Sequence, residues 1–372
     1  MTAQWIEAHR QEHRDLLLTL ARIPAPSNHE EQRAEFIKNW LEQQGAQGVY
    51  IDEALNVILP LGVTETNPLA VYAAHTDVVF PDMDPLPLHE ADGKIFCPGI
   101  GDDTASVAAL LMGAKYILEQ GLVPKNYGVL IVLDSGEEGL GNLKGMKALF
   151  DAYGHRIREF ISFDGGECRC VNRAVGSRRY RIAVETEGGH SYGSFGNRNA
   201  IAYLASLIDT LYTVKVPPIG RTTYNVGTIA GGTSVNTIAQ HAEMLYEFRS
   251  DEAEALEIME RHLKAALDFY RTKGITVTAE LVGDRPCSAP VDEEVLAAMT
   301  ARAEAATARH YGRELTYSAG STDCNIPLSR GVAALCLGCY RGFGAHTREE
   351  YIEVDSLAPG MNFLFEILLH HF

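Results

Sequence analysis

Five short segments of the chain carry imidazole or carboxylate side chains where strands are expected to end. They are HTD (75–77), GDD (101–103), DSGEE (134–138), DGG (164–166) and GAH (344–346). Ligands of open α/β sheets gather at the carboxyl ends of the strands, so these groups would converge. Several carboxylates in one partly dry cleft repel one another unless a cation lies among them. Mixed imidazole and carboxylate ligands suit zinc best, with cobalt or manganese as alternatives, and we expect two divalent ions.

Each segment has an ordinary structural interpretation when it is taken alone. A histidine such as His75 at a strand end is usually structural, and Asp102 and Asp103 would commonly cap the following helix. The paired glutamates at 137–138 would form a solvated turn, and Asp164 before two glycines is a normal turn residue. The HxD spacing favours a metal centre, because the second acid can hold the other ring nitrogen of the histidine. One metal centre also explains all five segments together.

The elements that would position these groups alternate between helices and apolar strands. Helices are predicted at 5–22, 29–44, 105–120 and 142–153, and buried strands at 69–79, 127–135 and 160–164. Such an alternation predicts an α/β fold, with a mostly parallel sheet covered by helices on both faces. We expect this catalytic, metal-binding domain to comprise residues 1–175 and 285–372.

Residues 176–284 show a different pattern, in which the order of elements is β-α-β-β-α-β. That order is typical of a small ferredoxin-like sheet with two helices. We therefore expect an α+β domain inserted into the first. No internal repeat and no low-complexity linker interrupts the chain.

Composition and charge limit the classes of partner. A chain of 372 residues with a net charge of −17 predicts two domains and argues against nucleic acid and membranes as partners, although a local basic pocket for a small anion remains compatible. No apolar run reaches the roughly 20 residues of a membrane span, and the N-terminus lacks signal-peptide features.

Seven cysteines, an odd number in apolar surroundings, predict reduced thiols and a cytoplasmic location. Cys168 and Cys170 have no second pair at zinc-finger spacing.

The ordered segments resemble the M20 family of metallopeptidases, which includes peptidase T, carboxypeptidase G2, acetylornithine deacetylase and succinyl-diaminopimelate desuccinylase. AAHTDVV, GIGDD, DSGEEG and GAHTREEYIEVDSL are similar to the family's metal-site motifs, and the likeness covers nearly the whole chain. The resemblance implies that Asp102 bridges two metals. His75 and Asp164 would complete the ligands of one metal, and Glu138 and His346 those of the other.

The same resemblance assigns the groups around the metals. Asp77 would orient the first histidine, and Glu137 would be the general base that takes a proton from the attacking water. The peptide bond between Asp102 and Asp103 is expected to be cis. Thr104 departs from the family, in which many members have Lys at this position.

In the inserted domain, GGHSYGSFGNRNAI (188–201) resembles the segment whose histidine reaches the active site, often that of a partner subunit. His190 would stabilise the oxyanion there, although a histidine stapling a turn is an equal alternative. Asn236 and Arg249 would bind the oxyanion and a substrate carboxylate, and the alternative for Arg249 is a surface ion pair. Ser321 and Thr322 would hold a carboxylate, or form a plain ST-turn.

The resemblance implies a catalytic domain with a lid that also forms a homodimer. The expected substrate is a short peptide, cleaved by an exopeptidase, or an N-acyl amino acid, cleaved by a deacylase. A metal-binding protein without turnover is the third alternative, and the presence of Glu137 argues against it.

Overall fold

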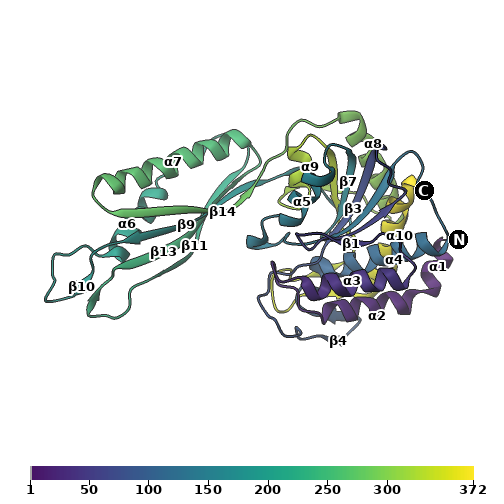
Figure 1. Ribbon diagram of the computed structural model, residues 1–372, viewed down its shortest axis with the longest axis horizontal. Coiled ribbons are helices and arrows are strands. Elements are labelled where there is room, and N and C mark those ends of the chain that lie inside the picture. The colour runs from purple at the N-terminus through teal and green to yellow at the C-terminus, as the bar shows by residue number, and fades with distance from the viewer. Residues whose placement is uncertain (1) are drawn as a thin grey trace. The chain divides into compact units, whose positions relative to one another are not determined.

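The computed structural model describes residues 2–372, which form two compact units. Unit 1 comprises residues up to Arg173 together with Ala289–Phe372, and unit 2 comprises Ala174–Ser288. Figure 1 shows the elements of each unit by label.

Unit 1 is built on an eight-stranded sheet. Its strands, in spatial order, are β1 (Tyr50–Ile51), β2 (Val57–Leu61), β6 (Gly128–Asp134), β3 (Leu69–His75), β7 (Ile157–Phe163), β16 (Ala333–Leu337), β8 (Arg169–Ala174) and β15 (Thr316–Gly320). The four central strands β6, β3, β7 and β16 run parallel, whereas β2 and β8 pair antiparallel with the outer two of them. The predicted α/β fold with a mostly parallel sheet is therefore confirmed.

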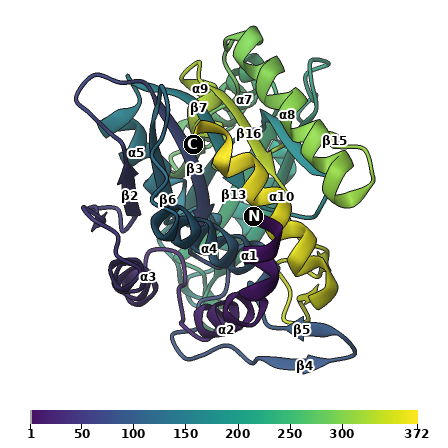
Figure 2. The same cartoon turned by 90° about the vertical axis from the view of Figure 1, so that its right-hand side faces the viewer.

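Helices cover both faces of this sheet, as expected (Figure 2). The helices of unit 1 are α1 (Thr2–Ala8), α2 (Arg10–Ala21), α3 (Glu31–Gln43), α4 (Ala105–Glu119), α5 (Lys144–Tyr153), α8 (Glu293–Tyr311), α9 (Asn325–Ser329) and α10 (Leu357–Leu368). One face packs against α4 and α10 in a single core with Tyr72 and Phe163, while α5 and α9 lie against the other face. Both β3 and β6 are buried along their whole length, which is why they read as continuous apolar runs.

One helix prediction needs correction. The expected helix over 5–22 is two helices, because His9 leaves helical geometry with φ −107° and ψ 12°. Its ring nitrogen Nδ1 lies 2.7 Å from the carbonyl oxygen of Trp5. A side-chain contact with the preceding turn of this kind competes with regular helix geometry.

A second small sheet in unit 1 contains β17 (Gly342–Phe343), β18 (Tyr351–Glu353), β5 (Lys94–Phe96) and β4 (His89–Ala91). Strand β18 leads into α10, and the loop between β17 and β18 carries His346. This sheet therefore fixes both ends of a loop that belongs to the candidate site.

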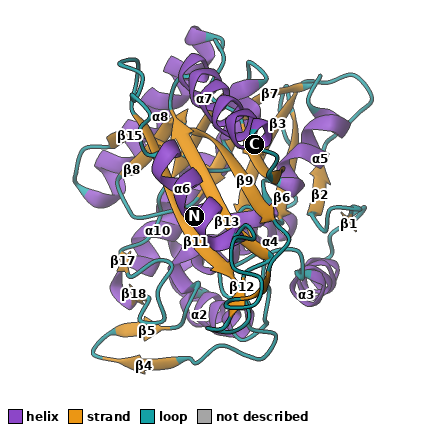
Figure 3. Ribbon diagram, turned by 90° about the vertical axis from the view of Figure 1, so that its left-hand side faces the viewer, coloured by secondary structure: helices purple, strands orange, loops and turns teal. Residues whose placement is uncertain are grey.

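Unit 2 has the predicted β-α-β-β-α-β order. Figure 3 shows its strands in orange and its helices in purple. Its elements are β9 (Gly176–Glu185), α6 (Ala200–Leu211), β11 (Thr222–Gly231), β13 (His241–Ser250), α7 (Ala253–Thr272) and β14 (Thr276–Arg285), with a short pair of β10 (Gly189–His190) and β12 (Thr237–Ile238). The four long strands form an antiparallel sheet in the order β11-β13-β9-β14. Alternate residues of β9 and β13 pack against α6 and α7, as in a ferredoxin-like sheet.

Candidate functional site

Two groups of potential metal ligands meet in unit 1, and both include Asp102. One contains His75, Asp102 and Asp164, the other Asp102, Glu138 and His346, and the ligand atoms within each lie within 4.8 Å of one another. The two oxygens of Asp102 face different histidines, with Oδ1 3.1 Å from Nε2 of His75 and Oδ2 3.1 Å from Nε2 of His346. The structure thus brings the five residues together from five separate segments.

Strand register explains part of this convergence. His75 ends β3 and lies opposite Asp134, which ends the parallel strand β6. Asp164 directly follows β7, on the other side of β3. Parallel strands end at the same edge, so these residues share it. Glu138 lies four residues beyond β6, where the chain turns back toward this edge.

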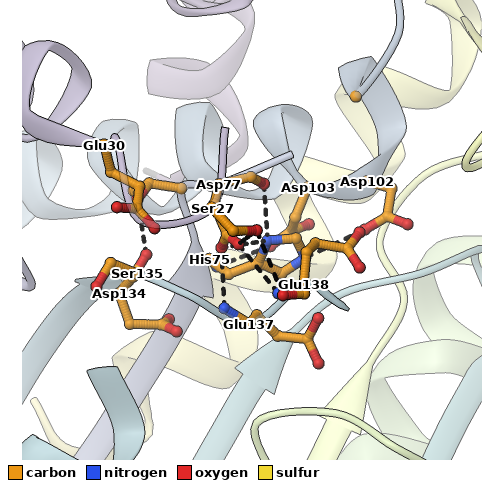
Figure 4. Close-up of polar contacts among 12 residues, drawn as sticks. Ser27, Glu30, His75, Asp77, Asp102, Asp103, Asp134, Ser135, Glu137 and Glu138 are labelled. Atoms are coloured by element: carbon orange, nitrogen blue, oxygen red, sulfur yellow. Dashed lines mark hydrogen bonds and ion pairs between the residues drawn. The ribbon is translucent and has the colours of Figure 1, made fainter. Parts of the chain in front are cut away.

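Asp77 mainly holds the turn that carries the paired glutamates. Its carboxylate accepts hydrogen bonds from the backbone N–H of Glu137 and of Glu138, both at 3.0 Å, and from the Ser27 hydroxyl at 2.6 Å (Figure 4). The same carboxylate lies 3.5 Å from Nδ1 of His75, while the carbonyl oxygen of Asp77 is nearer to that nitrogen, at 3.1 Å. One buried acid therefore couples the orientation of the histidine to the position of both glutamates.

The loop that presents Asp102 is held by Glu350. The Glu350 carboxylate accepts hydrogen bonds from the backbone N–H groups of Gly99, Gly101 and Asp102 at 2.6, 2.8 and 2.9 Å. Burial raises the pKa of Glu350 to about 7, although these hydrogen bonds favour its charged form. The Asp102–Asp103 peptide bond is cis, as predicted. Sequence reasoning missed Glu350, because nothing in the sequence distinguishes it from the adjacent Glu349.

A buried arginine lies behind this loop, where Thr104 replaces the family's usual lysine. The Arg33 guanidinium donates to the carbonyl oxygen of Thr76 at 2.7 Å and to the Thr104 hydroxyl at 3.4 Å. It is 1% exposed, and burial lowers its pKa to about 10. A positive charge is therefore present near the site even without the lysine.

The electrostatics show how strongly this cluster of acids favours positive charge. Burial, reinforced by the neighbouring Asp102, raises the pKa of Asp164 to about 8. The hydrogen bonds that the His346 ring donates to Asp102 and then to Glu138 raise its pKa to about 10. Burial opposes ionisation of Asp102, but hydrogen bonds with the two histidines lower its pKa overall. A raised pKa of a buried acid and of a neighbouring histidine is the response expected where several acids surround a site for a cation.

A second pair of buried acids, Asp134 and Asp323, lies next to the site. Burial raises the pKa of Asp134 to about 7 and that of Asp323 well above its ordinary value, and the two carboxyls interact with each other. Asp323 comes from the loop between β15 and α9, so the pair joins this loop to the end of β6. The sequence segment around Asp323 was recognised, but its pairing with Asp134 was not.

The loop residues proposed for carboxylate binding form a local turn. The Thr322 hydroxyl accepts a hydrogen bond from the backbone N–H of Cys324 at 3.2 Å, and the Thr322 N–H donates to Asn325 at 2.9 Å. Ser321 is partly buried. This is the geometry of the ST-turn alternative, and it leaves a substrate role for these residues as a prediction.

Unit 2 contains the remaining candidates. Nδ1 of His190 accepts hydrogen bonds from the backbone N–H groups of Tyr192 and Gly193, both at 3.2 Å, so Nε2 carries the proton of the neutral ring. Asn236 is adjacent, because Ser191 donates to its carbonyl oxygen at 2.9 Å. The histidine staples its own turn and still presents an N–H donor on an exposed ring.

Arg249 lies at the opposite end of β13 from the β10–β12 pair, in register with Ser177 of β9. Its guanidinium forms two hydrogen bonds with Glu247, at 2.9 and 3.0 Å. Within unit 2 the structure therefore brings His190 and Asn236 together but places Arg249 apart from them, in the ion pair that was its structural alternative.

Comparison with known proteins identifies the family. A profile of peptidase family M20/M25/M40 matches residues 71–370. Succinyl-diaminopimelate desuccinylase of Bordetella petrii is 28% identical over 325 residues, covering 79% of this chain and 80% of that protein. A tripeptidase structure from Staphylococcus aureus has a TM-score of 0.76 at 23% identity, covering 96% and 97% of the two chains.

A dinuclear metal-binding peptidase of Bacillus subtilis has a similar fold, with a TM-score of 0.66 at 16% identity and 98% coverage of both chains. No helix among residues 2–372 combines the length and apolar character that a membrane crossing requires. The chain therefore belongs to peptidase family M20/M25/M40 and is a metal-dependent amide hydrolase.

Proposed function

We propose that the protein is a two-zinc exopeptidase that cleaves short peptides. The observation that carries this proposal is the position of Asp102, whose two oxygens face His75 on one side and His346 on the other. A single carboxylate shared between two ligand groups is the arrangement that two adjacent cations need. The free amino acid at one end of a short peptide would be recognised through its terminal charge.

The residues present fit two zinc ions. Each group combines one imidazole with two carboxylates, a donor set that suits zinc, and cobalt or manganese would be accepted by the same ligands. His75, Asp102 and Asp164 would hold one ion, and Asp102, Glu138 and His346 the other. When bound, the metal pair supplies a strongly lowered pKa for a shared water, which becomes a nucleophile near neutral pH.

Glu137 is proposed as the general base. It is 6% exposed, adjoins Glu138 in the turn held by Asp77, and lies with His75 and Glu138 in a third close group of ligand atoms. Its carboxylate would accept a proton from water and deliver it to the leaving amine. His190 would donate the hydrogen bond from Nε2 to the oxyanion, with Asn236 beside it.

The recognition and assembly roles complete the proposal. Arg249, Ser321 and Thr322 would contact the substrate's carboxylate, and unit 2 would act as lid and dimerisation surface, so that His190 serves the site of a partner subunit. A cytoplasmic location is proposed because the seven cysteines are free and buried, as suits a reducing compartment.

A deacylase acting on N-acyl amino acids is the second candidate. The observation that favours it is the group of curated relatives, several of which are succinyl-diaminopimelate desuccinylases at 26–28% identity. The metal chemistry would be the same, and only the need to recognise a free amine would disappear.

The test is hydrolysis of a panel of dipeptides, tripeptides and N-acyl amino acids by the zinc-loaded protein, with metal content measured in parallel. We expect two zinc ions per chain and cleavage of dipeptides above N-acyl amino acids. The reverse preference would support the deacylase. Two bound zinc ions without turnover of any compound would contradict both candidates.

The variant Glu137→Ala separates the base from the metal ligands. Turnover should fall by about 10²- to 10⁴-fold, the contribution of a general base, while zinc content is unchanged. Glu65→Ala removes an exposed glutamate of the same unit and is the matched control. Full activity of Glu137→Ala would refute its role.

A further inference from the structure

A cavity of about 440 Å³ opens beside the metal-ligand cluster, entirely within unit 1. Asp102 and Asp164 form part of its wall, so a molecule bound at these acids has direct access to the cavity. Phe343 and Tyr351, whose ring centroids are 5.9 Å apart, contribute an aromatic surface. The cavity therefore has room for one end of a substrate whose amide bond lies at the cluster.

Three arginines line this cavity, although the protein as a whole is strongly acidic. Arg341 is neutralised by Glu167, Glu353 and Asp355. Arg313 is paired with the same Glu167 at 2.9 Å. These two guanidinium groups are already engaged by carboxylates of the protein.

Arg169 differs from the other two. Among the described residues, none offers the Arg169 guanidinium an ion pair or a side-chain hydrogen bond. Its side chain is exposed in the cavity wall, and its Cδ lies 4.0 Å from the position that a Cβ on Gly166 would occupy. The guanidinium is therefore an unused double hydrogen-bond donor within a few residues of Asp164.

The backbone around Arg169 is held tightly. Asp164 donates its N–H to Leu337 at 3.1 Å, and Gly338 donates to the carbonyl oxygen of Arg169 at 3.0 Å. Gly338 packs closely on Gly166: a Cβ added to Gly338 would lie 1.9 Å from the carbonyl oxygen of Gly166. The candidate metal ligand Asp164 and the backbone of Arg169 are thus held in fixed positions on one loop. A fixed spacing between two binding groups is required for a site to select substrates by length and charge.

We propose that Arg169 determines specificity by binding a carboxylate on the part of the substrate that enters this cavity. The preferred substrates are then amides with a second acidic group, carried on a short aliphatic chain that packs against Phe343 and Tyr351. A planar guanidinium matches a carboxylate with two parallel hydrogen bonds. This inference rests on the proposed function and names the class of substrate for the same site.

The test compares acidic and neutral substrates of nearly equal size. The pairs are glutamyl-alanine and glutaminyl-alanine, alanyl-glutamate and alanyl-glutamine, and N-succinyl-alanine and N-butyryl-alanine. We expect the acidic member of at least one pair to have a kcat/KM about 10-fold higher or more, the effect expected of a charge-assisted hydrogen bond. Equal cleavage within all three pairs would overturn the inference.

Two substitutions assign the preference to Arg169. Arg169→Met should lower kcat/KM for the preferred acidic substrate by roughly 10- to 100-fold and leave its neutral partner within about 2-fold. Arg169→Lys keeps the positive charge but loses the planar guanidinium. Its kcat/KM for the acidic substrate should lie between those of the unchanged protein and of Arg169→Met. Arg330→Met is the matched control, because Arg330 is an arginine of unit 1 outside the cavity, paired with Asp151. If Arg169→Met still cleaves the acidic substrate in preference to its neutral partner, the proposal is contradicted.

A binding measurement keeps this test separate from that of the proposed function. Calorimetric titration of the zinc-loaded chain with glutarate should give a Kd at least about 10-fold weaker for Arg169→Met than for Arg330→Met. Neutral substrates cleaved equally by all variants, without an acid preference, would leave the proposed function standing and remove the inference. If no substrate is cleaved, the proposed function fails, and equal glutarate binding by both variants then removes the inference as well.

Discussion

The two units of the molecule treat ionisable groups in opposite ways. Unit 1 buries acids in and around the candidate site, among them Asp77, Asp103, Asp134 and Asp323. In residues 174–288, all of which are described, Arg285 is the only charged side chain that is buried. The sheet of unit 2 buries alternate residues, as an antiparallel sheet with one packed face does, whereas β3 and β6 of unit 1 are buried throughout.

This difference indicates which unit loses folding stability to hold its candidate functional groups. Buried carboxylates that are not compensated destabilise a fold, so unit 1 carries an energetic demand that bound cations would satisfy. Two candidates of unit 2, His190 and Asn236, are exposed at the short β10–β12 strand pair and cost little. We therefore expect metal binding and stability to respond to changes in unit 1, and turnover alone to respond to changes in unit 2.

The largest effect is expected for Asp102→Ala. Removing the carboxylate shared by both ligand groups should abolish binding of both metals and reduce turnover by roughly 10³-fold or more, since the metal pair supplies several kcal/mol. Metal content by mass spectrometry and kcat on the best substrate check this result. If Asp102→Ala still binds two metals, metal binding does not depend on this acid of unit 1, and the expected difference between the two units is contradicted.

The next largest effect is expected for the pH dependence of folding stability after a chelator has removed the metals. The pKa of Asp164, raised to about 8 from 3.8, means that its contribution to stability is lost as pH rises from about 4 to 8. The pKa of His346, raised to about 10 from 6.5, means that its contribution is lost between pH 6.5 and about 10. Both signs agree, so the chelated protein should lose stability as pH rises from 5 to 8. The loss is on the order of 3 kcal/mol and comes mainly from Asp164, because solvent screens the interactions of the exposed His346 ring.

Hydrogen exchange locates this loss. Peptides from residues 2–173 and 289–372 should lose protection at pH 8 in a chelator and regain it when zinc is added. Peptides from residues 174–288 should not change. Equal loss of protection in both units would show that the demand for cations is not confined to unit 1.

A smaller effect is expected for His190→Ala, which should lower kcat by about 10²-fold without changing metal content or unfolding temperature. His241→Ala, which removes another exposed histidine of unit 2, is the control. A change in metal affinity for His190→Ala would place this residue with the groups of unit 1.

The smallest effect is expected for Asp77→Asn. The amide can accept hydrogen bonds from Ser27 and one glutamate N–H, but it cannot stabilise both backbone groups with a charge. Zinc affinity should fall by about 10- to 100-fold, as is typical when a partner of a metal ligand is lost. Asp82→Asn changes a partly exposed acid that is paired with Arg348, and it should have no effect on zinc affinity.

Much of the fold followed from the pattern of apolar residues. Strands β3, β6 and β7 could be predicted from continuous apolar runs, because burial on both faces of a strand requires apolar residues at every position. The ferredoxin-like sheet of unit 2 could be predicted from the order of its elements, because burial on one face leaves a periodic pattern. The break at His9 was not readable, because the periodicity continues through it and only a side-chain contact with Trp5 interrupts the helix.

The sequence by itself determined which five segments carry chemistry, since each combines a strand end with imidazole or carboxylate groups. Only the tertiary structure decided that Asp102 faces two histidines and that Asp77 holds the backbone of both glutamates. It also decided that no residue of the described range 2–372 pairs with the Arg169 guanidinium in the cavity beside Asp164. The reason is physical. Residue type and local period record burial and turns, whereas the direction of a backbone N–H or a guanidinium depends on contacts between segments that are far apart in the chain.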